Sequence, residues 1–359
     1  MTLKFFKFLA IALLVSCADA KPSGPAGIYV ISNTRYVPGE VAKFNFDCVA
    51  GFSLRIPWTS IETWNATLKQ PQYDFSRIDK TLEELRAIGK KMTLEIFVFK
   101  APDYVLALPD SESWVNPHPR QGGIQPTPWN PHARLAYRNM LRAMSQHRVA
   151  GTNWTLSEHP SLCSVDAPIV GLQGLRELSN TLVKLPGYNR QAFIDSVLDC
   201  VEASRSAFPA QNGFLALFKM EDANTRVPLD KTIADALMAQ YNQAGQPTLG
   251  FFQETLSDEG PNPTALGRLL KENADKTYIM FQALRPWALR DGEAAPRTNS
   301  SKNPVTGIRH AWKNYGSTYV ELYGADILHG NHVKEIAEWN QFFLDNQTGK
   351  KRNHPSAHK

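Results

Sequence analysis

The chain carries an arginine and a glutamate side by side, Arg176 and Glu177, soon after a short apolar run that starts at Ala167. The run Ala-Pro-Ile-Val-Gly-Leu is typical of a strand buried on both faces, and the charged pair falls where such a strand ends. In a barrel of parallel strands these ends converge on one mouth, where a carboxylic acid can act as a general acid or base. The alternative is that Glu177 is a structural ion-pair partner near the start of a helix.

Strand-like runs alternate with helical ones along the whole chain. The predicted strands are 27–32, 51–58, 92–98, the run around Ile169, 213–220, 247–254, 276–282 and 317–323. The predicted helices are 76–88, 132–147, 190–208, 230–244, 263–273, 305–315 and 331–345. Eight strands in this alternation, without repeats or a linker, predict an α/β protein with a (β/α)8 TIM barrel. A doubly wound open sheet is the alternative, but its Gly-x-Gly-x-x-Gly turn and the P-loop are absent.

The N-terminus has the layout of a secretory signal, because basic residues precede an apolar run at 8–15 and small residues follow it. Cleavage after Ala20 would release a free exported protein. The segment Leu-Val-Ser-Cys ending at Cys17 instead resembles a lipoprotein box, which would leave Cys17 acylated. The run is too short to remain as a membrane anchor. We therefore expect an exported protein that is periplasmic, secreted or lipid-anchored to the cell envelope, touching a membrane only through a lipid on Cys17.

The rest of the chain divides simply. Residues 1–20 are the predicted signal, 21–348 a single barrel domain, and 349–359 a disordered basic tail. The net charge of +5 lies partly in that tail, and no basic helix or Arg-rich run points to nucleic acid as a partner. After removal of the signal, three cysteines remain, which allows one disulfide. We expect Cys163, placed in a loop, to pair with Cys200, placed on a helix.

Polar and aromatic residues gather at the ends of the predicted strands. They are Arg55, Trp58, Glu177, Glu254, Gln282, Trp287 and Glu321. Aromatic faces stack on sugar rings while charged and amide groups bind hydroxyls, so a carbohydrate is the expected ligand. The two tryptophans have an alternative role as packed loop anchors. The alternative role of Arg55 is to neutralise a neighbouring carboxylate. Glu95, inside the third predicted strand, has the alternative role of a buried structural charge paired across the barrel.

Other chemistries lack their motifs. Neither His-x-x-x-His nor His-Glu-x-x-His occurs, so no metal site is expected, and nothing calls for a cofactor. The Gly-x-Ser-x-Gly turn of the α/β-hydrolases is also missing.

The segment Val-Gly-Leu-Gln-Gly-Leu-Arg-Glu that ends at Glu177 resembles the Val-Gly-Trp-Gln-x-Asp-Asn-Glu segment of family 42 glycoside hydrolases, the β-galactosidase type of clan A. Residues 54–91 and 131–147 are similar to that family too, so the resemblance covers about the first half of the chain. It implies that Glu177 is the acid/base, which protonates the leaving oxygen and then activates water. It also implies that Arg55 supports the nucleophile, while Gln173 and Arg176 lie where the sugar binds.

Two positions depart from the family pattern. Arg176 replaces an asparagine that binds the sugar 2-hydroxyl, and Gln282 stands where strand seven should end in the nucleophilic glutamate. An amide is a far poorer nucleophile, so a second carboxylate must come from elsewhere. We favour Glu321, because it is next to the vacated position and Tyr323 follows it. Glu254 on strand six is the alternative, and a barrel that binds glycans without cleaving them is a third reading.

The sequence thus predicts an exported glycoside hydrolase that cleaves O-glycosidic bonds of an oligo- or polysaccharide with Glu177 and Glu321. The residues expected to bind the substrate are Arg55, Trp58, Gln173, Arg176, Glu254, Gln282, Trp287 and Tyr323. A catalytically inactive glycan-binding barrel and a structural envelope lipoprotein are the rival hypotheses.

Overall fold

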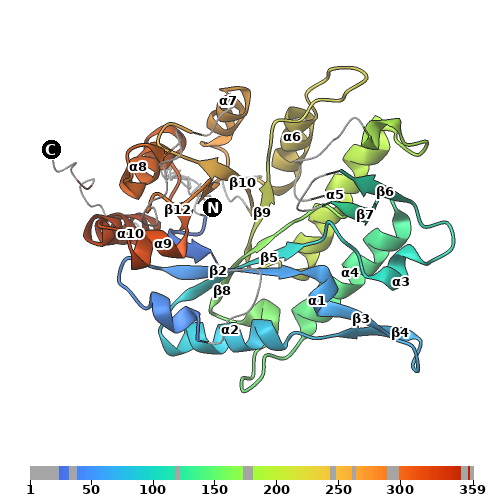
Figure 1. Cartoon of the computed structure of the whole chain (residues 1–359), viewed down its shortest axis with the longest axis horizontal. Coiled ribbons are helices and arrows are strands. Elements are labelled where there is room, and N and C mark those ends of the chain that lie inside the picture. Colours follow the sequence, from blue (N-terminus) through green and yellow to red (C-terminus); the bar gives the residue numbers. More distant parts are fainter. Residues whose placement is uncertain are drawn as a thin grey trace, which may run out of the picture.

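The computed structural model describes residues 24–31, 39–117, 122–172, 181–242, 248–260, 264–288, 299–348 and 355. Within these residues, parallel strands form a closed barrel in the order β1-β12-β11-β10-β9-β8-β5-β2. The strands are β1 Gly27–Ile31, β2 Gly51–Pro57, β5 Lys91–Phe97, β8 Leu162–Asp166, β9 Asn212–Ala216, β10 Leu249–Leu256, β11 Ile279–Ala283 and β12 Tyr319–Leu322. Helices surround the barrel (Figure 1), so the predicted (β/α)8 fold is confirmed.

The long helices begin and end within a few residues of their predicted bounds. They are α2 Ser76–Ala87, α4 Pro131–Gln146, α5 Arg190–Ala207, α6 Leu229–Tyr241, α7 Thr264–Asn273, α8 Pro304–Tyr315 and α10 Val333–Gln347. The cap of α4 illustrates why: Asn130 accepts a hydrogen bond from the backbone of Ala133 at 3.0 Å, and Pro131 occupies the first helical position. No helix in the described part of the chain is long and apolar enough to cross a bilayer.

Shorter elements extend the loops at the carboxyl ends of β2, β5 and β12. They are α1 Trp58–Ile61, α3 Asp103–Leu106, α9 Gly324–Leu328, and two antiparallel hairpins, β3 Glu62–Asn65 with β4 Gln70–Tyr73 and β6 Ser113–Asn116 with β7 Gly123–Pro126. The long loop predicted at 101–131 therefore contains α3 and the β6–β7 hairpin. In Figure 1 both hairpins project from the same side of the barrel as α1 and α3. The predicted signal at 1–20, with Cys17, and the tail at 349–359 apart from Pro355 lie outside the described residues.

The predicted position of the fourth strand was wrong. β8 spans Leu162–Asp166, and the apolar run that starts at Ala167 follows it as a turn. This turn closes at Gly171, whose φ is +76° and whose missing Cβ would lie 2.0 Å from the carbonyl oxygen of Pro126. The sequence pattern does not indicate a strand at 162–166, because the inward face of β8 is polar. Ser164, for example, shares a hydrogen bond of 2.8 Å with Thr93 inside the barrel. A strand with a polar inner face shows no continuous apolar run.

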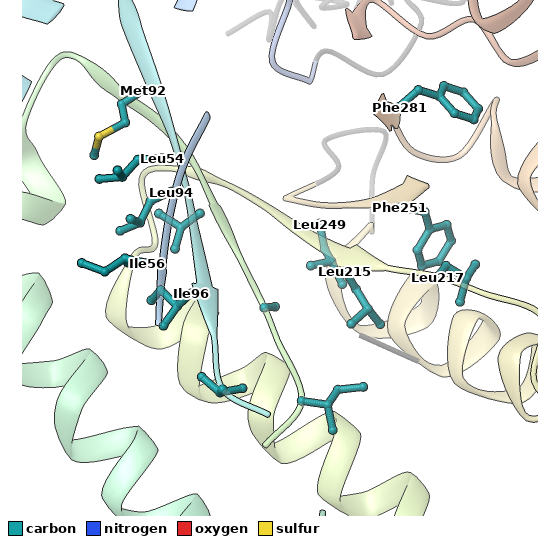
Figure 2. Close-up of a cluster of buried hydrophobic side chains, with 14 of the residues drawn as sticks. Leu54, Ile56, Met92, Leu94, Ile96, Leu215, Leu217, Leu249, Phe251 and Phe281 are labelled. Atoms are coloured by element: carbon teal, nitrogen blue, oxygen red, sulfur yellow. The ribbon is translucent and has the colours of Figure 1, made fainter. Parts of the chain in front are cut away.

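Side chains alternate between the two faces of each strand. Leu54, Ile56, Leu94 and Ile96 belong to the large apolar core cluster that the barrel shares with the helices around it (Figure 2). The residues between them, Arg55 and Glu95, point into the barrel. A separate apolar cluster fills the part of the interior near the amino ends of the strands. Its members are Tyr29, Phe214, Phe252, Tyr278, Met280 and Tyr319. This cluster lies toward the amino ends of the strands, whereas Arg55, Glu95 and Asp166 lie nearer the carboxyl ends of theirs.

The predicted disulfide between Cys163 and Cys200 is wrong. Cys48, Cys163 and Cys200 are all free thiols. Cys163 lies on β8, and its sulfur is 3.2 Å from the hydroxyl of Tyr29 inside the barrel, whereas Cys200 is buried on the outer helix α5. The wall of the barrel therefore separates the two sulfur atoms.

Candidate active site

Arg55, near the carboxyl end of β2, is the centre of a polar network inside the barrel. Its Nε lies 3.2 Å from Oε1 of Glu95, and its Nη2 lies 3.4 Å from Oε2 of Glu321. The same Nη2 donates to Oε1 of Gln282. Four strands thus contribute to one network, and the structure brings together Arg55, Gln282 and Glu321, which the sequence placed at the mouth.

Glu95 is a buried charge paired with Arg55, which is the structural role expected from the sequence. Its Oε1 accepts from Ser53 Oγ at 2.5 Å as well as from Arg55, and its side chain is 4% exposed. The guanidinium and the Ser53 hydroxyl replace hydrogen bonds to water that this side chain loses on burial. Glu95 therefore holds Arg55 in position from the neighbouring strand.

Glu321 is fully buried and lies deeper than expected. Its Oε1 accepts from the Tyr319 hydroxyl at 2.6 Å, and its exposed fraction is 0%. Burial, followed by the charge of Glu95, raises the pKa of Glu321 to about 8, and Arg55 only partly offsets this shift. At neutral pH the group is therefore mostly a neutral carboxylic acid. With no open surface, it does not reach a ligand in the mouth in this conformation.

A pocket opens at the carboxyl ends of β5, β8, β9 and β10. Its empty volume is about 380 Å³, a figure that includes the space open to solvent. Three acidic residues line it, Glu95, Asp166 and Glu254. Leu172 lines it too, five positions before Glu177 in the sequence. Residues 173–180, with Gln173, Arg176 and Glu177, lie outside the described residues.

Glu254 reaches this pocket through an irregularity in β10. The register between β10 and β11 shifts between Gln253 and Leu256, as in a β-bulge. The Oε1 of Gln253 accepts the backbone N–H of Thr255 at 2.5 Å, which fixes the irregular stretch. Glu254 is 9% exposed and lines the pocket.

Asp166 is the pocket residue that the sequence missed. It ends β8, and its Oδ1 accepts from the backbone N–H of Ile96 at 3.0 Å. Burial and then the charge of Glu95 raise the pKa of Asp166 well above its ordinary value. The available signal was the alternation of Ser164 and Asp166 with Val165, a period of two that marks a strand with one polar face.

The two predicted tryptophans are packed as loop anchors, the alternative that the sequence left open. Trp58 is fully buried, its indole N–H donates to Glu62 at 2.6 Å, and the edge of its ring meets Tyr137. Trp287 is also fully buried, and its indole N–H donates to Asp258 at 2.7 Å. Neither indole has a face open to a sugar.

Tyr323 directly follows β12 and is half-buried beside the network. Its hydroxyl lies 3.5 Å from the carbonyl oxygen of Leu284, and burial raises its pKa. Across the described residues, no group of three or more His, Cys, Asp or Glu side chains is arranged to hold a metal ion.

No protein-family model and no curated protein matches this sequence. Among solved structures, the fold is similar to an endo-1,4-β-mannanase from Rhizomucor miehei, with a TM-score of 0.57 and 8% identity over 89% of this chain and 95% of that one. It is also similar to a β-galactosidase from the psychrophilic Marinomonas ef1, with a TM-score of 0.53 and 11% identity over 90% of this chain and 61% of that one. A β-galactosidase from Rahnella sp. R3 gives a TM-score of 0.51 and 14% identity over 92% and 57%.

The chain therefore spans about three fifths of the length of these β-galactosidases. At such low identity the likeness shows the fold alone. It defines the protein as a (β/α)8 barrel of the architecture that these glycoside hydrolases have.

Proposed function

We propose that the protein is a glycoside hydrolase that cleaves O-glycosidic bonds of an oligo- or polysaccharide in the mouth of its barrel. The observation that carries this proposal is the pocket at the carboxyl ends of the strands. Glu254 lines it, and so does Leu172, which directly precedes the segment that contains Glu177. The similar solved structures are a mannanase and β-galactosidases, which supports a carbohydrate as the substrate.

Glu177 is the proposed acid/base and Glu254 the proposed second carboxylate. Glycosidic cleavage needs two carboxyl groups that both touch the scissile bond or its attacking water. Glu254 lines the pocket, whereas Glu321 is fully buried beneath Arg55 and accepts from Tyr319. This geometry supports Glu254 on β10 as the second carboxylate over Glu321 on β12, the residue that the sequence favoured.

In the proposed reaction, the carboxylic acid of Glu177 gives its proton to the glycosidic oxygen as the bond from that oxygen to the anomeric carbon breaks. The Glu254 carboxylate either bonds to the anomeric carbon or removes a proton from the water that attacks it. The first course needs carboxyl groups about 5–5.5 Å apart and the second about 6.5–9.5 Å. Gln173 and Arg176 remain predicted contacts to the sugar in the segment of Glu177.

The test is hydrolysis by the full chain of β-1,4-mannan, aryl β-galactosides and β-1,4-linked gluco- and glucosamine oligosaccharides, followed by release of reducing ends or aryl alcohol. Glu177→Gln and Glu254→Gln should each lower turnover by several orders of magnitude. Glu321→Gln should have a much smaller effect, and Glu259→Gln on an exposed loop is the matched control. Activity of Glu254→Gln within a few-fold of wild type would reject its role, and a loss in Glu321→Gln equal to that in Glu177→Gln would return the role to Glu321.

Gln282 favours a second candidate, a barrel that binds glycans without cleaving them. Its amide oxygen accepts from Arg55, and the residue is 4% exposed, so an amide is built into the network at the end of strand seven. Calorimetric binding of an oligosaccharide with no release of reducing ends over days supports this candidate. Release of reducing ends by Gln282→Glu but not by wild type supports it further.

We also propose export, with or without a lipid on Cys17. Cell fractionation tests export. Labelled palmitate that attaches to wild type but not to Cys17→Ala would establish the tether, and a structural envelope lipoprotein would carry that tether without any glycan binding.

A further inference from the structure

Trp64 on β3 presents an aromatic ring to solvent. It is 44% exposed, whereas Trp58 and Trp287, the two tryptophans predicted at the mouth, are fully buried. Its ring stacks on that of Tyr104 in α3, with the ring centroids 4.8 Å apart and an angle of 28° between the planes. Because Tyr104 covers one face of the indole, the exposed surface belongs to the opposite face and to the edge.

A buried carboxylate holds this stack in place. The Tyr104 hydroxyl donates to Oε1 of Glu62, and the indole N–H of Trp58 donates to Oε2 of the same group at 2.6 Å. Glu62 itself is 1% exposed. A carboxylate that receives a donor on each oxygen fixes the ring of Tyr104, and with it the ring of Trp64 that lies against it. The exposed indole therefore has a rigid support and loses little conformational entropy when a ligand binds.

The stack stands beside the mouth pocket but outside it. Pro57 at the end of β2 pairs with Phe97 at the end of β5, and Phe97 lines the pocket. Trp64 follows Pro57 by seven residues, and Tyr104 follows Phe97 by seven. Seven residues span at most about 25 Å, so both rings lie within that distance of these strand ends. The hairpin of Trp64 projects from the same side of the barrel as α1 and α3 (Figure 1), and neither ring is part of the pocket lining.

The hairpin around Trp64 is nearly free of charge. From residue 63 to residue 73, Lys69 is the only charged side chain. Pro71 pairs with Trp64 across the hairpin, so the neighbour on the same face is also apolar. A flat aromatic face of this kind suits the apolar face of a neutral sugar ring better than a charged ligand.

We propose that Trp64 is a sugar-stacking platform outside the pocket, and that the substrate is a neutral polysaccharide chain that runs from the pocket across the β3–β4 hairpin. The inference rests on the proposed function, since the same chain enters the mouth of the barrel. One sugar unit occupies the pocket and a unit further along the chain stacks on Trp64. A monosaccharide or disaccharide in the pocket makes no use of this ring.

Other occupants of this face fit less well. A membrane surface with anionic lipids calls for a cluster of basic side chains, and the hairpin offers Lys69 alone. A stable interface with a second copy of the chain buries roughly 1,200 Å² or more in total. One indole, even with the exposed Leu68 at the hairpin turn, supplies much less than that. A single sugar unit needs no more than one ring face.

The test is affinity electrophoresis of the full chain through gels that contain soluble β-1,4-mannan, β-1,4-galactan or hydroxyethyl cellulose. The Glu177→Gln background blocks cleavage by the proposed acid/base. For the polymer that retards this protein most, Trp64→Ala should raise the dissociation constant about tenfold, because it removes the whole ring face. Trp64→Phe keeps a smaller flat face and should recover most of the affinity.

Trp154→Ala is the matched control. Trp154 is 40% exposed, but it lies between α4 and β8, at the amino end of the barrel and away from the mouth. This variant should leave the retardation by every polymer unchanged. Thermal melting checks that each variant is folded.

Chain length provides the second measurement. In calorimetry with oligosaccharides of the linkage that binds, Trp64→Ala should weaken the hexasaccharide about tenfold and the disaccharide less than about twofold, because only the longer chain reaches the platform. A loss of equal size for both lengths would overturn the inference, since Trp64 would then act on the pocket itself.

The outcomes separate this inference from the proposed function. Unchanged polymer affinity in Trp64→Ala, or a Glu177→Gln protein that binds none of the three polymers, overturns the inference whether or not the chain hydrolyses short glycosides. A tenfold loss in Trp64→Ala, when the wild type releases no reducing ends, supports the inference and rejects the hydrolase. If Trp64→Ala instead abolishes sedimentation with phosphatidylserine vesicles, or a dimer seen by light scattering, and leaves polymer affinity unchanged, the face belongs to a membrane or to a second copy.

Discussion

Replacing Glu321 by glutamine tests the interior network most directly. Glu321 is fully buried, and burial together with the charge of Glu95 raises its pKa from an ordinary value of 4.5 to about 8. Glutamine keeps the shape and an acceptor oxygen for Tyr319 and Arg55 but cannot ionise. We therefore expect Glu321→Gln to remove a pH dependence of stability rather than to break the fold.

The sign follows from proton binding. Between the pKa of Glu321 in the unfolded chain and its raised pKa in the barrel, the folded state holds a proton that the unfolded state has lost. The free energy of unfolding of the wild type must then decrease as the pH rises through this window. One pKa unit corresponds to about 1.4 kcal/mol. The wild type should lose up to roughly 5 kcal/mol relative to Glu321→Gln between about pH 4.5 and 8, and nothing further above that.

The assay is urea unfolding of wild type, Glu321→Gln and the exposed control Glu83→Gln at about pH 5, 6.5 and 8, compared as free energies of unfolding. Glu83→Gln should follow the wild type, while the Glu321→Gln profile should diverge from both as the pH rises. If the wild type instead became more stable than Glu321→Gln with rising pH, Glu321 would be an ionised partner of Arg55.

Three further predictions concern the fold. Asn130→Ala should lower the free energy of unfolding, measured in urea, by about 1 kcal/mol, because it removes the side-chain oxygen that accepts from Ala133. An unchanged free energy would show that this cap does not stabilise α4. Trp58→Ala should cost about 3–5 kcal/mol by the same measurement, because the ring is fully buried, and a much smaller cost would show that it does not anchor its loop. Reducing agents should leave the melting temperature unchanged, because the described cysteines are free thiols, and a drop on reduction would contradict this.

The barrel could be predicted because the outward faces of its strands are apolar where helices cover them. Leu54 and Ile56 on β2, like Leu94 and Ile96 on β5, give a recurrent apolar signal that survives whatever fills the interior. The fourth strand failed this test, since β8 combines a short length with the polar inward residue Ser164. The neighbouring run is apolar because it packs as a buried turn, and periodicity alone does not distinguish that from a strand.

The meeting of Arg55, Gln282 and Glu321 could be predicted because parallel strands bring their carboxyl ends together. The burial of Trp58 could not be, since it depends on Glu62 and Tyr137, a hairpin residue and a helix residue that converge only in three dimensions. Residue type gives the same expectation for a tryptophan that stacks on sugar and for one that fills a core.

Register explains why Glu254 rather than Glu321 reaches the mouth. In a closed (β/α)8 barrel each strand is offset from its neighbour by about one residue along the axis. The direction of the offset is fixed by Arg55. Glu321 pairs with Tyr29 on β1, and Tyr29 pairs with Gly51 on β2. Arg55 is four residues after Gly51, so without an offset it would lie four residues nearer the mouth than Glu321. An offset of about one residue per strand reduces this to about two, within reach of an arginine side chain.

The same offset, followed around the barrel the other way, separates the two glutamates. Glu321 pairs with Gln282, and Phe281 pairs with Gln253 on β10. One residue of offset per strand then brings Phe252 to the level of Glu321 and leaves Glu254 about two residues nearer the mouth. Phe252 is indeed almost fully buried in the inner apolar cluster, and Glu254 lines the pocket. On β12, only a residue beyond Leu322 would lie level with a sugar that Glu254 can touch. Turnover should therefore depend on Glu254, and the pH dependence of stability on Glu321.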